Sequence, residues 1–159
     1  MDRSADKVIR WRAVASGWLV AALAGVAISP LLGALYRLVA GPPAGRGELT
    51  GGVVVVSLVS GFLAYLLGGY VAARLSRGFS GLNGATTAVF GLMLGMILAL
   101  ILNLFDSVFT AGVAVPPACF GLSGSALLAG LILFLFNLFG GYVGGKLGEP
   151  SSPDMGRPG

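Results

Sequence analysis

Long uncharged, apolar stretches alternate with short polar segments along the whole chain. The charge-free stretches cover residues 13–36, 49–73, 78–105 and 107–145. A helix needs about 20 residues to cross the roughly 30 Å hydrocarbon core of a bilayer. Each of the first three stretches fits one such helix, and the fourth is longer than one helix requires.

Two prolines divide the fourth stretch. Pro116 and Pro117 cannot lie inside a helix without breaking its hydrogen bonds. We therefore expect a loop over residues 106–120, with the last helix beginning near Gly121. Four membrane spans are then predicted, at about residues 13–37, 49–74, 82–105 and 121–146.

The predicted fold is an all-α, integral membrane four-helix bundle, formed by one domain over residues 1–148. Asn83 and Gly84 are interpreted as a cap or turn that opens the third span. Residues 149–159 are rich in Pro, Ser and Gly and are expected to form a disordered tail.

The first span has an alternative interpretation as a cleaved signal peptide, which would leave three spans. Its basic start, with Arg10 and Arg12, fits a signal peptide. However, a signal peptide's apolar region is only about 7–15 residues long, and residues 13–36 exceed that length without a clear Ala-x-Ala site after them. We therefore expect a retained helix.

Composition supports a membrane protein and excludes several kinds of chemistry. Of the 159 residues, 56% are hydrophobic and 10% charged, whereas soluble domains carry about 25% charged residues. There is no His and only one Cys, which excludes an intrachain disulfide, a Cys/His metal site and a Ser-His-Asp triad. We expect no enzymatic activity, no metal and no cofactor.

The distribution of basic residues predicts the orientation. All of the ten Lys and Arg residues except Arg37 and Arg46 lie before the first span, between the second and third, or after the fourth. Because basic residues are retained on the cytoplasmic side, both termini should be cytoplasmic. This accounts for the net charge of +4, and no water-exposed segment is large enough for a nucleic-acid partner. Contact of the basic N-terminus with anionic lipid is a second explanation.

An internal repeat links the second and fourth spans. The segments 67–75 (LGGYVAARL) and 139–147 (FGGYVGGKL) share Gly-Gly-Tyr-Val and a final Leu, and Arg74 corresponds to Lys146. Both segments end a span on the same predicted side. The repeating unit is therefore predicted to be a helical hairpin used twice in parallel, with a pseudo-twofold axis along the membrane normal.

Aromatic and basic residues mark the predicted cytoplasmic boundary. Tyr and Trp favour the headgroup level, and Lys and Arg extend their charges to water from there. A substrate-binding role is the alternative for the two tyrosines. The expected interfacial anchors are Trp11, Tyr70, Arg74, Tyr142 and Lys146.

Small residues recur at four-residue spacing in every span. Helices associate in lipid chiefly by close backbone contact, which small residues permit. We therefore expect a tight bundle with little room for a central pore, although the same rows could join separate copies. The expected packing glycines are Gly17, Gly25, Gly33, Gly68, Gly91, Gly95, Gly140 and Gly144.

Few polar side chains lie within the spans. Asn103 and Asp106 share a helix face near the outer end of the third span, and Asn137 lies in the inner half of the fourth. Polar groups at membrane depth are candidates for a transport path. The competing interpretation makes Asp106 a hydrated end residue and the two asparagines hydrogen-bonding partners of neighbouring helices.

Three short motifs resemble small four-span prokaryotic membrane protein families that have no assigned activity. They are Ile9-Arg10-Trp11-Arg12-Ala13-Val14, the Gly-Gly-Tyr-Val of the second span, and Leu82-Asn83-Gly84-Ala85. The resemblance implies a bacterial or archaeal plasma membrane and transfers no functional residue. Small multidrug transporters and fluoride channels also have four spans. This chain lacks the first-span Glu of the former and the third-span Thr/Ser/Phe-rich break of the latter.

Two functions remain open at this point. The leading hypothesis is a non-enzymatic accessory or structural membrane component that associates with copies of itself or with another membrane protein. The alternative is a small homo-oligomeric channel or transporter for an ion or small solute, with Asn103, Asp106 and Asn137 along its path.

Overall fold

Four α-helices account for nearly all of the chain that the structure, a computed structural model, describes: residues 10–40, 51–76, 80–109 and 124–149. The helices are α1 (Trp11–Ala40), α2 (Gly51–Leu75), α3 (Ser80–Phe109) and α4 (Gly124–Leu147). All four are long and apolar enough to cross a bilayer. This confirms the all-α fold with four potential spans and indicates a multi-pass membrane protein.

The third helix differs most from its expected bounds. It begins at Ser80 and continues to Phe109, so Asn83 and Gly84 lie inside it and do not form a turn before it. The loop predicted from residue 106 is wrong for its first four residues, because none of them breaks a helix and the next proline after them is Pro116. Pro116 and Pro117, and the expected tail from residue 150 on, lie outside the described residues.

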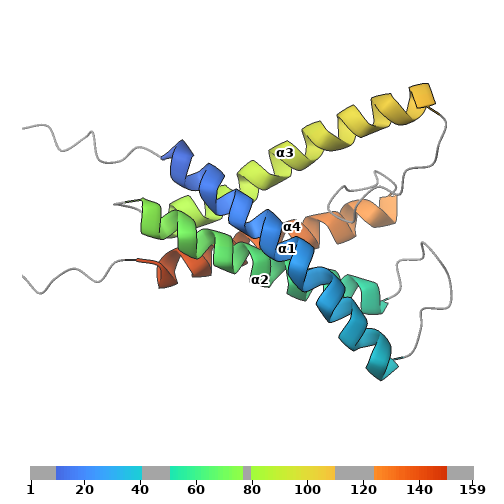
Figure 1. Cartoon of the computed structure of the whole chain (residues 1–159), viewed down its shortest axis with the longest axis horizontal. Helices are drawn as coiled ribbons and strands as arrows, with labels where there is room; N and C mark the ends of the chain where they lie inside the picture. Colours follow the sequence, from blue (N-terminus) through green and yellow to red (C-terminus); the bar gives the residue numbers. More distant parts are fainter. Residues whose placement is uncertain (1–9, 41–50, 77–79, 110–123, 150–159) are drawn as a thin grey trace, which may run out of the picture.

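The helices run alternately up and down, and α2 occupies the centre of the bundle. It packs against all three other helices, whereas α1 and α4 lie on opposite sides of it and do not contact each other over their described residues. The starts of α1 and α3 and the ends of α2 and α4 gather at one end (Figure 1). We call this the basic end, because it carries Arg10, Arg12, Arg74 and Lys146.

The packing is tight at the basic end and opens away from it. Figure 1 shows that α1 and α3 cross near this end and diverge toward the other. Burial follows the same gradient: the buried residues of α1 all lie between Ala13 and Ala21, and those of α2 between Ser60 and Ala73. Toward its far end, the described part of α3 has large side chains that face outward, among them Met96, which is 64% exposed.

Small residues fill the interior, and large apolar residues face outward. Among the described side chains the largest that are fully buried are Val14, Thr87 and Ser76, and no Leu, Ile or Phe is buried. Leu and Val gain little from burial between helices when lipid is equally apolar, whereas small residues allow backbones to approach. The size distribution is therefore the one that a lipid solvent favours.

Candidate functional site

The α1–α2 crossing is a contact between two glycines. A Cβ placed on Gly17 would lie 2.6 Å from the carbonyl oxygen of Gly68, and a Cβ on Gly68 would lie 2.5 Å from the carbonyl oxygen of Gly17. Real Cβ atoms are essentially never this close to another heavy atom. Ala21 and Ala72 flank the crossing and are 3% and 0% exposed. The sequence therefore uses glycine here to let two backbones touch.

The α3–α4 crossing is built in the same way from different positions. A Cβ on Gly141 would lie 2.5 Å from the carbonyl oxygen of Gly84, and one on Gly84 would overlap the carbonyl oxygen of Gly141. One turn further along α4, a Cβ on Gly145 would overlap the carbonyl oxygen of Ser80. Gly84 therefore contributes to a helix crossing and not to a turn.

A second row of glycines on α4 faces α2. A Cβ on Gly140 would lie 2.6 Å from the carbonyl oxygen of Phe62, and a Cβ on Gly148 would lie 2.5 Å from that of Tyr70. Between these two positions, a Cβ on Gly144 would overlap the carbonyl group of Leu66. Thus α4 presents two adjacent glycine rows to two different helices.

The two copies of the repeat contact different neighbours. In α2, Gly68 faces the preceding helix α1, while the next residue, Gly69, lies against Gly141 of α4. In α4 the assignment is exchanged: Gly140, which corresponds to Gly68, faces α2, and Gly141 faces the preceding helix α3. Equivalent glycines therefore do not make equivalent contacts. The repeat is a similarity in sequence, and the parallel structural repeat stays a prediction.

The other four predicted packing glycines have different surroundings. A Cβ added to Gly91 would overlap the hydroxyl of Tyr65 and come close to the ring of Trp18. Gly25 has an ordinary contact, because its added Cβ would lie 3.7 Å from the Cβ of Ala64. Gly33 has nothing within 4 Å among the described residues. Since a four-residue step exceeds one turn by about 40°, the row that starts at Gly17 winds away from α2 before it reaches Gly33. Gly95 lies in α3.

Sequence reasoning missed Gly69 as a packing residue, although its pairing with Gly68 was visible. A Gly-Gly pair offers two adjacent faces, and a search for one row per helix selects only one of them. Gly61 was also missed, because it stands alone in sequence and is explained only by the Asn137 side chain that approaches it.

Aromatic rings connect α1 to α3 at the basic end. Phe90 of α3 lies between Trp11 and Trp18, with ring-centroid distances of 6.3 Å and 6.0 Å, and the Trp18 contact is edge-to-face. Such pairs contribute about 0.5–1.5 kcal/mol beyond area burial. Trp11, predicted as an interfacial anchor, is 60% exposed and so combines this contact with an outward-facing ring.

The remaining predicted anchors occupy the ends of α2 and α4. Arg74 donates a hydrogen bond from Nε to the Tyr70 hydroxyl at 3.1 Å, with its guanidinium 5.3 Å from the centre of that ring. Lys146 forms an exposed ion pair with Glu149 at 3.3 Å. Tyr142, which is 42% exposed, lies beside Gly81 of α3. The two copies of the repeat thus use their cations differently.

The candidate polar path is only partly described. Asn137 points from α4 toward Gly61 of α2, and its buried Oδ1 has no hydrogen-bond partner among the described residues. The expected hydrogen bond to a neighbouring helix is therefore not formed by this oxygen. Asn103 and Asp106 lie in the last part of α3, but their side chains lie outside the described ones, so the path stays a prediction.

Several hydroxyl groups in the described helices donate to carbonyls of their own helix, whereas the buried Oγ of Ser80 has no partner among the described residues. Ser16 donates to the carbonyl of Arg12, Thr86 to that of Leu82 and Thr87 to that of Asn83, at 2.7–3.0 Å. Such local bonds are the usual way for Ser and Thr to be accommodated inside a helix. Over the described residues, no three His, Cys, Asp or Glu side chains gather as a metal ion would require.

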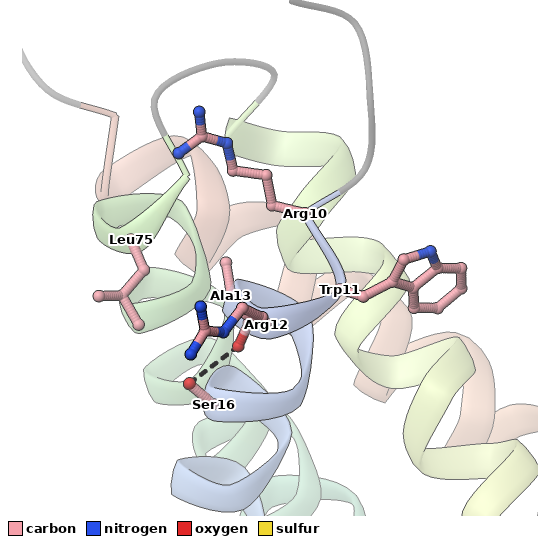
Figure 2. Close-up of a pocket in the computed structure, with 6 residues that line it drawn as sticks. All are labelled: Arg10, Trp11, Arg12, Ala13, Ser16 and Leu75. Carbon is pink, nitrogen blue, oxygen red and sulfur yellow. Dashed lines mark hydrogen bonds between the residues drawn. The ribbon is translucent and has the colours of Figure 1, made fainter.

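One cavity lies at the basic end, between the start of α1 and the end of α2. Its volume is about 450 Å³, and it is lined by Arg10, Trp11, Arg12, Ala13, Ser16 and Leu75. Figure 2 shows Arg10 and Arg12 extending on the side of α1 that faces Leu75, while Trp11 points to the other side, toward α3. The cavity is therefore lined by two cationic side chains and by an apolar wall.

Comparison with known proteins adds no relative to this picture. No protein-family model, no curated protein and no solved structure matches the chain. The resemblance to four-span prokaryotic families stays a prediction, and function has to be argued from the geometry.

Proposed function

We propose that this chain is a non-enzymatic, multi-pass protein of the plasma membrane that acts as an accessory or structural component. It works as a homo-oligomer or together with another membrane protein. The observation that carries this proposal is the filling of the interior by backbone: Gly17 meets Gly68, and Gly84 meets Gly141. Where these helices cross, they leave no space for a substrate between them.

The outer surface supports the same proposal. The buried residues of the described interior are mainly Ala, Gly, Ser and Thr, and the Thr87 hydroxyl donates to its own helix, so the interior offers little chemistry. Away from the basic end, α1 and α3 diverge and present large apolar side chains such as Leu23, Val26 and Met93, which are 59–76% exposed. A protein of this shape acts through what it packs against.

The proposed orientation places the basic end, and with it both termini, in the cytoplasm. In the described residues, Arg10, Arg12, Arg74 and Lys146 lie at this end and only Arg37 lies at the other. Basic residues that flank spans remain on the cytoplasmic side.

The test is a pull-down of the tagged protein from its native membrane in a gentle detergent, with the intact mass of the eluted species. A stoichiometric second subunit supports the accessory role. A homo-oligomer supports the structural role if the purified protein carries no flux in liposomes. A monomer that elutes alone contradicts the proposal.

A small channel or transporter is the second candidate, and Asn137 is the observation that favours it. Its amide oxygen is buried without a donor among the described residues. This oxygen therefore stays available to accept a hydrogen bond from a solute or to coordinate an ion. Any measured flux should then fall in Asn137→Leu and Asp106→Asn. If both variants carry the flux of the unmodified protein, the transport hypothesis loses its residues.

A further inference from the structure

We propose that the cavity at the basic end binds the phosphate headgroup of one anionic phospholipid, whose acyl chain lies along α1. The site goes beyond the proposed accessory function and does not depend on it. Its walls come from the start of α1 and the end of α2, and its volume of about 450 Å³ lies in the roughly 300–1,000 Å³ range of small-molecule sites.

The charged groups of the cavity select an anion. Arg10 and Arg12 both line it, and a guanidinium presents a planar fork of N–H donors that matches two phosphate oxygens. Neither arginine forms an ion pair within the described residues. The one carboxylate among the described side chains is that of Glu149, which lies beyond the end of α4 and pairs with Lys146. Over their described residues α4 and α1 do not contact each other. The counterion of the two guanidinium groups is therefore expected to be an anion that these helices do not supply.

The surface below the cavity selects a lipid over a free phosphate ion. Arg12, Ser16, Leu19, Leu23 and Val26 follow one face of α1 at helical spacing. The three apolar residues of this row are 54%, 64% and 76% exposed. From Arg12 to Val26 the helix rises about 21 Å at 1.5 Å per residue, which is enough to accompany an acyl chain through the roughly 15 Å of one leaflet. Leu75 forms the opposite apolar edge of the cavity.

The experiment measures lipid binding to the purified full-length protein in detergent by native mass spectrometry. Phosphatidylglycerol, phosphatidylcholine and inorganic phosphate are added in separate titrations. The site variant is Arg10→Gln/Arg12→Gln. The matched control, Arg74→Gln/Lys146→Gln, removes the same charge from the same end, where those cations already contact Tyr70 and Glu149.

The expected result is one phosphatidylglycerol bound more tightly than phosphatidylcholine. Because hydrogen bonds between guanidinium groups and phosphate are charge-assisted, the affinity for phosphatidylglycerol should fall about tenfold or more in the site variant and stay within about twofold in the control. Equal losses in the two variants would mean that net charge alone attracts lipid. Saturation by inorganic phosphate at the affinity of the lipid would assign the site to a soluble anion. Either result overturns the proposal.

A second variant keeps both arginines and tests the cavity itself. Leu75→Glu places a carboxylate on the wall facing the two guanidinium groups, where it competes as an internal counterion. Phosphatidylglycerol affinity should then fall although the charge of α1 is unchanged, and Leu75→Gln should retain it. An unchanged affinity in Leu75→Glu would refute this location.

Discussion

Gly17 and Gly68 face each other across the α1–α2 crossing with no room for a side chain on either residue. Each would place a Cβ 2.5–2.6 Å from the other's carbonyl oxygen. Because both obstacles are backbone atoms, neither can be relieved by a rotamer change. A larger residue at this crossing has to separate the two helices.

Gly17→Ala and Gly68→Ala should each destabilise the protein. Overpacking of a tight interior costs about 1–3 kcal/mol, and the backbone contact places these variants at the upper end. The measurement is the unfolding midpoint in detergent, followed by circular dichroism. Gly33→Ala is the control: its added methyl meets nothing among the described residues, and alanine is the better helix former, so its midpoint should be unchanged or raised. Equal losses at Gly33 and Gly68 would contradict the crossing.

The destabilisation caused by Gly→Ala at the other glycines should depend on whether the added methyl group meets backbone or a side chain. Gly69 meets the backbone of Gly141, whereas Gly61 and Gly91 meet the side-chain ends of Asn137 and Tyr65. A side chain can move aside, but a backbone at a crossing cannot. Gly69→Ala should therefore lower the unfolding midpoint more than Gly61→Ala or Gly91→Ala in the same assay. The reverse order would show that the close approach of α2 and α4 is not rigid.

Phe90→Leu should loosen the contact between α1 and α3. The substitution removes two aromatic contacts, with Trp11 and Trp18, and should cost about 1–3 kcal/mol in unfolding free energy when both are counted. The emission of both tryptophans should shift together, because they share this ring. Phe139→Leu is the control, since Phe139 pairs with Phe62 of α2, away from either Trp. A shift of equal size in the control would contradict the assignment.

The two ends of the bundle should label from opposite sides of the membrane. Val39→Cys and Glu149→Cys place thiols at the far end of α1 and beyond the end of α4, at residues that are both exposed. In a Cys119→Ser background, a membrane-impermeant maleimide added to intact cells should label residue 39 and leave residue 149 unlabelled until the cells are opened. Labelling of both in intact cells would refute the orientation.

Much of the fold could be predicted because it follows from solvent and length. Four apolar stretches long enough to span a bilayer require four helices, since backbone polar groups must be satisfied inside each span. α3 extends past its predicted end to Phe109, because a charged residue such as Asp106 does not by itself end a helix.

The candidate site was less accessible to sequence reasoning because it depends on the rotation of each helix about its axis. The Gly-Gly pairs of α2 and α4 were visible, but which glycine faces which neighbour was not, and the structure assigns them in opposite ways. The cavity joins Arg10 and Arg12 to Leu75, a residue far away in sequence. No spacing pattern in one helix could reveal that proximity.

The distribution of small residues inside and large residues outside reverses the usual rules of mutational tolerance. In a soluble protein, truncating a buried leucine is among the most harmful changes, and enlarging a surface alanine is among the mildest. Here none of the described leucines is buried, and alanines and glycines hold the helices together. Random variation should therefore shrink or exchange the outward-facing Leu, Ile and Val residues freely, while the sites least free to vary are mostly those with the smallest side chains.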